Sequence, residues 1–260
     1  MMTNNILFWL LICGHLLGDF YFQTPEMAKG KKKSSVIFLK HCLIYALAML
    51  LALLPVIDGH ILMVWFAVSV SHGIIDFLKI TVENLATKKT PVLCFFQSNL
   101  FVLDQLLHVI IILLASVIAR DIISLNLLGE YLRSFYSMLE IQLLPLAFIK
   151  GLFIILVIGK PANIIIQEIN RKEKIESHSD TDVKTDREYK NAGKIIGILE
   201  RIIIVMMIML KQYAAIALIL TAKSITRYKK IENEPAFAEY YLVGTLLSLI
   251  ISVVAVLAVS

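Results

Sequence analysis

Cysteine is scarce in this 260-residue sequence. The three that occur, Cys13, Cys42 and Cys94, lie in apolar segments and form no Cys-x-x-Cys pair. Their odd number argues against a disulfide framework, so we expect them to behave as small buried apolar residues. The sequence also lacks a glycine-rich phosphate loop and a Gly-x-Ser-x-Gly elbow. It therefore has no sign of a P-loop nucleotide enzyme or of a serine hydrolase with a nucleophile elbow.

Charge is sparse as well: 17% of the residues are charged, whereas 58% are hydrophobic. This composition is too apolar for an ordinary soluble domain. Apolar runs of about 20 residues recur along the chain, and each is long enough to cross a hydrocarbon layer of about 30 Å. We therefore predict an all-α, polytopic transmembrane helix bundle. We interpret the net charge of +5 as a signal of membrane topology, because lysine and arginine are enriched in cytoplasmic loops. We therefore do not interpret it as a nucleic-acid-binding surface, and we expect no nucleic-acid partner.

Hydropathy predicts the membrane spans. They are residues 5–24, 36–57, 60–83, 93–119, 141–163 and 237–259, with residues 194–228 forming one helix or two. A single helix over 194–228 would be about 52 Å long, well beyond one span. We therefore favour two short helices that turn near Lys211, Gln212 and Tyr213, although no glycine or proline marks that turn. The prediction is eight spans, or seven if this stretch is one helix.

Lysine and arginine in alternate loops orient the spans. These residues are Lys29, Lys31, Lys32 and Lys33, then Lys88 and Lys89, then Arg171, Lys172, Lys174, Lys184, Arg187 and Lys190. By the positive-inside rule these loops are cytoplasmic, which places both termini outside a cytoplasmic (inner) cell membrane. The N-terminus lacks a basic region before its first apolar run, so we expect a retained span rather than a cleaved signal peptide.

The predicted organisation has four parts. Residues 1–119 form a four-span half, and residues 120–167 hold a surface amphipathic helix (120–140) and the fifth span. Residues 168–190 form a charged, mobile cytoplasmic linker. Residues 191–260 hold the C-terminal spans.

Histidine and aspartate recur four residues apart inside three predicted spans. The pairs are His15 with Asp19, His72 with Asp76, and Asp104 with His108, and His41 stands alone in a fourth span. Residues i and i+4 share one face of an α-helix. Such groups are costly in lipid, which marks them as candidates for function. The predicted orientation places all of them toward the cytoplasmic leaflet, with the Asp104 pair nearest the centre.

Imidazole and carboxylate ligands suit Zn²⁺, Fe²⁺ or Mn²⁺, and we expect a divalent metal, with zinc first. The candidate metal ligands are His15, Asp19, His41, His72, Asp76 and His108, and the candidate catalytic carboxylates are Asp19, Asp76 and Asp104. Seven candidates exceed the needs of one zinc ion, so two metals share the site or some residues serve as support or base. The structural alternative is a hydrogen-bonded clasp between helices for each pair, and simple packing for His41.

A second polar group lies in the C-terminal spans. Together with Gln23, its members are candidates for binding a substrate head group: Glu200, Arg201, Lys223, Arg227 and Glu239. Lys223 and Arg227 are an i,i+4 pair that suits a phosphate or carboxylate. The alternative is that these basic residues snorkel and set topology, while the glutamates neutralise Arg201 and Arg227.

Several motifs resemble a bacterial integral-membrane family, the domain-of-unknown-function 3307 family. They are His15-Leu-Leu-Gly-Asp19 with Gln23, Ser71-His72-Gly-Ile-Ile-Asp76, Asp104-Gln105-x-x-His108, Gly197-x-Leu-Glu200-Arg201, Ala222-Lys223-Ser224-Ile-x-Arg227 and Phe237-Ala-Glu239-Tyr240-Tyr241. The resemblance extends over nearly the whole chain, and departs from the family at Lys211-Gln212, where a glycine is expected. It implies an integral membrane protein and no defined activity. The His-x3-Asp pairs are also similar to the sites of intramembrane zinc lipid hydrolases of the alkaline ceramidase and adiponectin-receptor types, as an analogy between sites alone.

Three functions are compatible with these residues. The first is a metal-dependent intramembrane hydrolase that acts on a lipid or lipid-linked substrate from the cytoplasmic leaflet. The second is a metal-ion or proton-coupled transporter, which needs a polar route through the outer leaflet. The third is a membrane-bound partner or sensor protein without catalysis. Homo-oligomerisation is left open.

Overall fold

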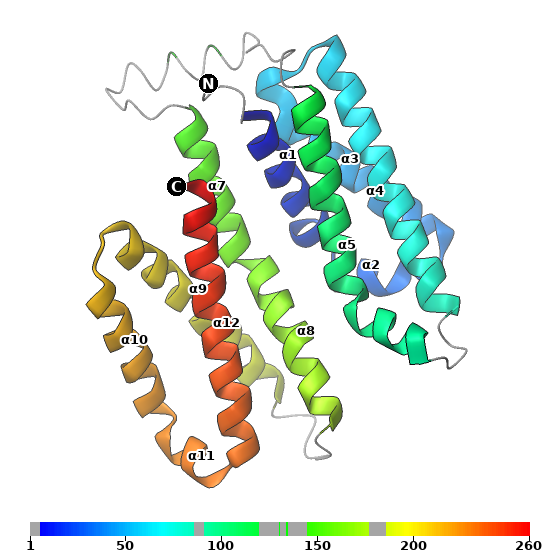
Figure 1. Ribbon diagram of the computed structural model, residues 1–260. Helices are drawn as coiled ribbons and strands as arrows, with labels where there is room; N and C mark the ends of the chain where they lie inside the picture. The colour runs from blue at the N-terminus through cyan, green and yellow to red at the C-terminus, as the bar shows by residue number, and fades with distance from the viewer. Residues whose placement is uncertain (1–5, 86–90, 120–129, 131–133, 135–144, 177–185) are drawn as a thin grey trace. The chain divides into compact units, whose positions relative to one another are not determined.

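The structure is a computed structural model that describes residues 6–85, 91–119, 130, 134, 145–176 and 186–260. Every regular element in these ranges is helical (Figure 1), which confirms the predicted all-α class. The chain forms two compact units, Met1–Phe153 and Ile154–Ser260, and each is described by itself.

The first unit is a bundle of long helices. Its elements are α1 (Ile6–Leu16), the π-helical turn η2 (Leu17–Tyr21), α2 (Pro25–Gly30), α3 (Ser35–Leu53), the 3-10 turn η3 (Leu54–Val56), α4 (Gly59–Leu85), α5 (Pro91–Ile118) and most of α7 (Pro145–Ile158). Helix α1 packs against α3 and α5, and α4 packs against both α3 and α5. In Figure 1 the short α2 lies at the end of this bundle where α1 and η2 finish.

Two glycines let α1 and η2 approach α3 closely. A Cβ atom on Gly14 would lie 2.9 Å from Met49 Sδ, and one on Gly18 would lie 2.8 Å from Tyr45 Cδ2. A larger residue at either position would force the helices apart. The close approach brings η2 against the middle of α3.

The second unit contains the remaining helices. They are α8 (Lys160–Glu176), α9 (Asp186–Met209), α10 (Tyr213–Thr226), α11 (Tyr228–Asn233) and α12 (Pro235–Val259), which follow the end of α7. Helix α12 packs against α8 and α9, and α9 packs against α10. Helix α8 continues to Glu176 and α9 begins at Asp186, so helix occupies both ends of the predicted linker, whereas residues 177–185 lie outside the described residues.

Five of the described helices are long and apolar enough to cross a membrane. They are Ser35–Val56, Gly59–Asn84, Leu100–Ile118, Leu146–Ile169 and Phe237–Val259, and each overlaps a predicted span. Two shorter apolar helices, Ile6–Tyr21 and Tyr213–Thr226, overlap two others. The predicted amphipathic helix at 120–140 lies outside the described residues except at 130 and 134, which are helical.

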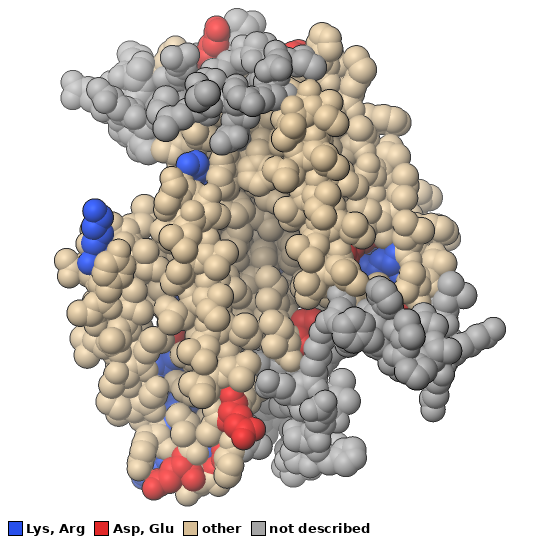
Figure 2. Space-filling model, viewed as in Figure 1, with Lys and Arg blue, Asp and Glu red and all other residues tan. Residues whose placement is uncertain are grey.

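The outer faces of these helices are apolar, as expected for contact with lipid. On α3 the exposed leucines repeat every fourth residue, at Leu39, Leu43, Leu47 and Leu51. Figure 2 shows one face of the molecule on which uncharged side chains cover most of the described surface. Because water penalises large exposed apolar surfaces, this pattern suits helices whose solvent is hydrocarbon.

The predicted turn within 194–228 is confirmed. Helix α9 ends at Met209 and α10 begins at Tyr213. Lys211 between them has φ of 58°, in the left-handed region. Gln212 N donates to Met207 O at 2.8 Å and Lys211 N donates to Ile208 O at 3.0 Å, which is the Schellman pattern of a helix C-terminus. The hydrogen-bond pattern ends the helix here although the sequence has lysine where glycine is usual.

Replacement of Lys211 by glycine is expected to stabilise the protein by about 1 kcal/mol, because glycine adopts the left-handed conformation without the Cβ penalty. The measurement is the free energy of unfolding in detergent micelles. Lys194→Gly, in the interior of α9, is the matched control and should destabilise by about 1 kcal/mol. A loss of stability in Lys211→Gly would contradict the argument.

Candidate metal centre

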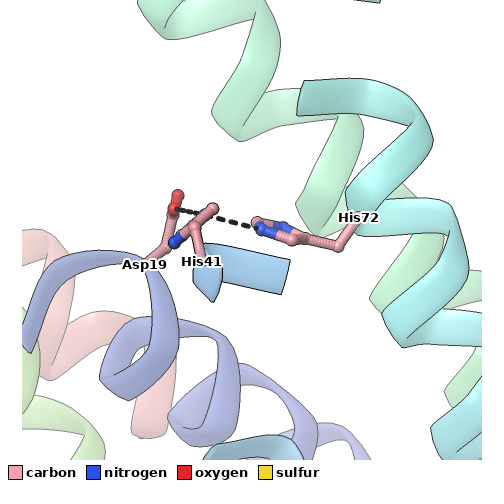
Figure 3. Close-up of side chains that lie close together, drawn as sticks. All are labelled: Asp19, His41 and His72. Atoms are coloured by element: carbon pink, nitrogen blue, oxygen red, sulfur yellow. Dashed lines mark hydrogen bonds and ion pairs between the residues drawn. The ribbon is translucent and has the colours of Figure 1, made fainter. Parts of the chain in front are cut away.

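Donor atoms from three separate elements of the first unit converge in its interior. One atom each from Asp19, His41 and His72 lie within 4.8 Å of one another. The Nε2 atoms of His41 and His72 are 3.1 Å apart, and Asp19 Oδ1 lies 3.5 Å from His41 Nε2. Figure 3 shows these three side chains pointing toward one another from different helices.

A second carboxylate borders the same point. Asp76 Oδ2 lies 3.1 Å from His41 Nε2 and 3.7 Å from His72 Nε2. Ligand atoms around a tetrahedral zinc with bonds of about 2.0–2.1 Å are separated by about 3.3 Å. The four separations given above, 3.1 to 3.7 Å, are close to that spacing, and the Asp19 and His72 donor atoms lie within 4.8 Å of each other. Two imidazoles with carboxylates are a zinc-type donor set.

Burial makes this convergence costly without a bound cation. His41 is fully buried, and His72 and Asp76 are 1% exposed. The converging histidine atoms are the Nε2 atoms, whose nearest polar neighbours within the described part of the chain are each other and the carboxylates. The Nδ1 atoms on the other edge of each ring have no hydrogen-bond partner there, and an ion held by Nε2 would leave them for a water to satisfy. The residues therefore fit a metal ion in donor type, spacing and burial.

A π-helical turn positions Asp19. Phe22 N donates to Leu17 O at 2.8 Å, the i to i+5 bond that defines the turn. Such turns are rare and are frequent at functional sites. The turn interrupts the α-helical register between His15 and Asp19, which the sequence placed on one α-helical face. Asp19 faces His41, whereas His15 has other partners.

His15 is held by neutral groups. Its Nδ1 lies 3.3 Å from Tyr45 Oη and its Nε2 lies 3.2 Å from Gln105 Oε1. Gln105 Nε2 in turn donates to Asp19 Oδ2 at 3.0 Å. His15, which the sequence predicted as a ligand, is thus placed one layer from the convergent atoms and supports Asp19 through Gln105.

The third predicted pair forms a neighbouring polar group. Asp104 accepts from Lys79 Nζ at 2.7 Å and from Gln105 Nε2 at 3.2 Å. His108 Nδ1 lies 2.8 Å from the Asp104 carbonyl oxygen, and the His108 ring stacks on His15 with centroids 5.0 Å apart. Gln105 therefore links this group to Asp19 of the candidate metal centre.

A lysine that sequence reasoning assigned to topology lies in the centre. Lys31 Nζ donates to Asp76 Oδ2 at 2.5 Å and to Gln23 Oε1 at 3.2 Å. Lys31 is 8% exposed, whereas Lys32 and Lys33 beside it are exposed. Gln23, predicted to bind substrate, thus helps to hold Lys31.

The centre lies toward one end of the bundle. His41 is in the first two turns of α3, and Asp19 is in the turn that ends the α1–η2 segment. Toward the other end the core is apolar, with Leu7, Leu11 and Met49 fully buried. Among the residues described there, Ser116 is buried and the Ser69 hydroxyl oxygen is enclosed as well. The described core therefore offers a one-sided site and no continuous polar route through the bundle.

The predicted C-terminal group divides into separate parts in the second unit. Arg201 is 1% exposed, and its Nε donates to Ile158 O at 2.6 Å. Glu200 accepts a hydrogen bond from Lys223 Nζ at 2.6 Å. Arg227 and Glu239 are exposed, and Arg227 lies over the Phe237 ring at 6.0 Å. The structure does not gather these residues around one point.

Three residues of the centre were missed by sequence reasoning. Tyr45, whose ring stacks on His72 at 3.5 Å, follows His41 by four residues on α3. Lys79 follows Asp76 by three residues on α4, so helical periodicity carries a signal for both. Lys31 has no such signal, because the short α2 and the following turn set its place.

Comparison with known proteins found one match. The profile of a family described as "Protein of unknown function (DUF3307)" matches residues 7–135. The matched segment contains every residue of the candidate metal centre, whereas the resembling motifs from Gly197 to Tyr241 lie beyond its end. No curated protein and no solved structure matched the chain.

Proposed function

Since the chain belongs, through residues 7–135, to the DUF3307 family, whose description leaves the activity open, we propose a function from the centre itself. The protein is a metal-dependent hydrolase that cleaves a lipid or lipid-linked substrate within the cytoplasmic leaflet of the inner membrane, with both termini outside. The observation that carries the proposal is the convergence of Asp19, His41 and His72 in a buried site near one end of an apolar bundle.

The metal is zinc in this proposal, and Asp19, His41 and His72 hold it. Three protein ligands are typical of catalytic zinc, which keeps one position for water or substrate. A divalent ion at this point would activate water for attack at neutral pH and polarise the bond to be cleaved. The ligand set of two histidines and one carboxylate occurs among zinc hydrolases, which supports hydrolysis over a purely structural role.

Other residues supply the remaining chemistry. Asp76, 3.1 Å from His41 Nε2, is the carboxylate placed to take a proton from the attacking water. The buried Lys31 and the half-buried Lys79 bring positive charge next to Asp76 and Asp104. That charge would stabilise negative charge developing on the head group of a lipid ester, amide or phosphoester.

The same geometry ranks hydrolysis above transport. A transporter needs polar groups on both sides of its site, whereas the described core beyond the centre contains two separate buried hydroxyl groups, those of Ser69 and Ser116, and no buried charged side chain. A one-sided site instead suits a substrate whose head group enters from the membrane surface and whose chains stay in lipid.

The decisive experiment combines metal analysis with an assay on lipid esters, amides and phosphoesters. Purified full-length protein is expected to hold about one zinc per chain. Asp76→Asn should keep the metal and lose hydrolysis by about 100-fold or more, because it removes the base. Glu26→Gln, on the exposed face of α2, is the control and should match the unaltered protein.

Three results would overturn the proposal. They are a metal-free preparation that takes up no metal, full hydrolysis by Asp76→Asn, or metal flux in proteoliposomes that Asp76→Asn abolishes. The last would favour a transporter.

A further inference from the structure

One oxygen of Asp76 is shared between Lys31 and the metal centre. Oδ2 accepts a hydrogen bond from Lys31 Nζ at 2.5 Å, and the same oxygen lies 3.1 Å from His41 Nε2 and 3.7 Å from His72 Nε2. By distance alone this oxygen is as well placed to join a metal's ligands as Asp19 Oδ1, which lies 3.5 Å from His41 Nε2. The lysine therefore competes with a metal for this oxygen.

Local structure fixes Lys31 in that position. Thr24 Oγ1 accepts from Met27 N at 3.2 Å and caps α2, and Lys31 N donates to Met27 O at its end. Gly30 packs on Ile37, since a Cβ atom there would lie 2.7 Å from Ile37 Cδ1. A buried ammonium with two acceptors differs from a surface lysine, whose ion pairs contribute little.

We propose that Lys31 is a positioning residue that keeps Asp76 out of the metal's ligand set. The inference rests on the proposed function and adds the device that keeps the centre open. With Asp76 held by Lys31, the metal has three protein ligands and an open position, as in catalytic zinc sites. With Asp76 free, four protein ligands would close the centre, as in structural zinc sites.

The direction in which metal affinity changes when Lys31 is replaced separates this role from a structural one. Removal of a positive charge beside a divalent ion, with release of a further ligand, raises metal affinity. Loss of local structure lowers it. The change of choice is Lys31→Met, which keeps most of the aliphatic stem and removes the ammonium.

The experiment measures zinc affinity by chelator competition, the absorption spectrum of the Co²⁺-loaded protein, and hydrolysis, all on full-length protein in detergent. Lys31→Met is expected to bind zinc about tenfold more tightly or better, to show a changed Co²⁺ spectrum, and to lose hydrolysis. Lys31→Arg should retain the affinity and spectrum of the unaltered protein, because its guanidinium also holds a carboxylate. Lys33→Gln, an exposed neighbour, is the control for net charge.

Two further variants keep the test decisive. In the Lys31→Met background, Asp76→Asn should reverse the gain in affinity, because the released ligand is gone. If Lys31→Met does not fold, Gln23→Leu removes the second acceptor of Lys31 and should raise affinity in the same direction by a smaller factor.

The outcomes distinguish the two proposals. Failure of the unaltered protein and of Lys33→Gln to bind metal refutes the proposed function. Normal metal binding by both, with equal or weaker affinity and an unchanged spectrum in Lys31→Met, refutes the role of Lys31 alone.

Discussion

Replacement of His72 by alanine is expected to abolish both the metal binding and the hydrolytic activity that we propose. His72 Nε2 lies 3.1 Å from His41 Nε2 and 3.7 Å from Asp76 Oδ2, at the point where the donors meet. Loss of an outer-shell partner costs about 10- to 100-fold in metal affinity, and loss of a ligand should cost more. Elemental analysis of the purified variant measures this directly.

The matched control is His60→Ala on the same helix. His60 is exposed near the start of α4, where its backbone N donates to Asp58 Oδ1. The control should bind metal as the unaltered protein does. If His72→Ala lowers thermal stability yet leaves both metal content and activity unchanged, the polar cluster serves packing. The partner or sensor function would then be favoured.

Replacement of Arg201 by methionine should destabilise the second unit by about 3 kcal/mol or more, because buried hydrogen bonds to a charged group are lost and their acceptors stay buried. Helix α7 ends at Ile158, whose carbonyl accepts from Arg201 Nε at 2.6 Å. Arg201 also donates to Asn163 Oδ1 at 2.8 Å and to Ser248 Oγ at 3.5 Å. One side chain on α9 thus joins the α7–α8 break to α12.

Unfolding free energy in detergent measures the loss. Arg227→Met is the matched control and should cost at most about 1 kcal/mol, because the exposed guanidinium makes a cation–π contact with Phe237 of that order. If Arg201→Met is as stable as the unaltered protein but binds lipid head groups less tightly, the substrate-binding role that the sequence suggested for Arg201 would be supported.

Much of the fold follows from hydropathy and helical periodicity. The apolar spans and the turn at Lys211 were predictable. A single helix over 194–228 is too long for one span, and one crossing would also place Arg227, Lys229 and Lys230 outside, against the positive-inside rule. The Schellman hydrogen bonds at that turn explain why no glycine was needed. The break between α7 and α8 was not predictable from local sequence. The carbonyl group of Ile158 at that break accepts a hydrogen bond from Arg201, which is distant in sequence.

The candidate site was predictable in composition and less so in arrangement. Periodicity identified His72 with Asp76 and drew attention to His41 and Asp19. It also grouped His15 with Asp19, which an uninterrupted α-helix would place on one face. The π-turn separates them, and no residue type in Leu17–Tyr21 specifies that turn. Lys31 was not predicted to belong to the site, because the positive-inside rule already explains a run of lysines in a loop.

The π-turn also makes the centre dependent on chain length within one short segment. Each residue advances an α-helix by about 100°, and η2 accommodates one residue more per turn than an α-helix does. Reversion of Leu17–Tyr21 to α-helix at unchanged length would therefore rotate everything after it by about that angle and turn Gln23 away from Lys31. Deletion of one of these five residues together with that reversion would instead leave the chain after the turn on nearly its present face. The arrangement of the centre thus depends on one extra residue being kept as a π-turn, and a substitution that favours regular α-helix here would disturb the site without touching a ligand.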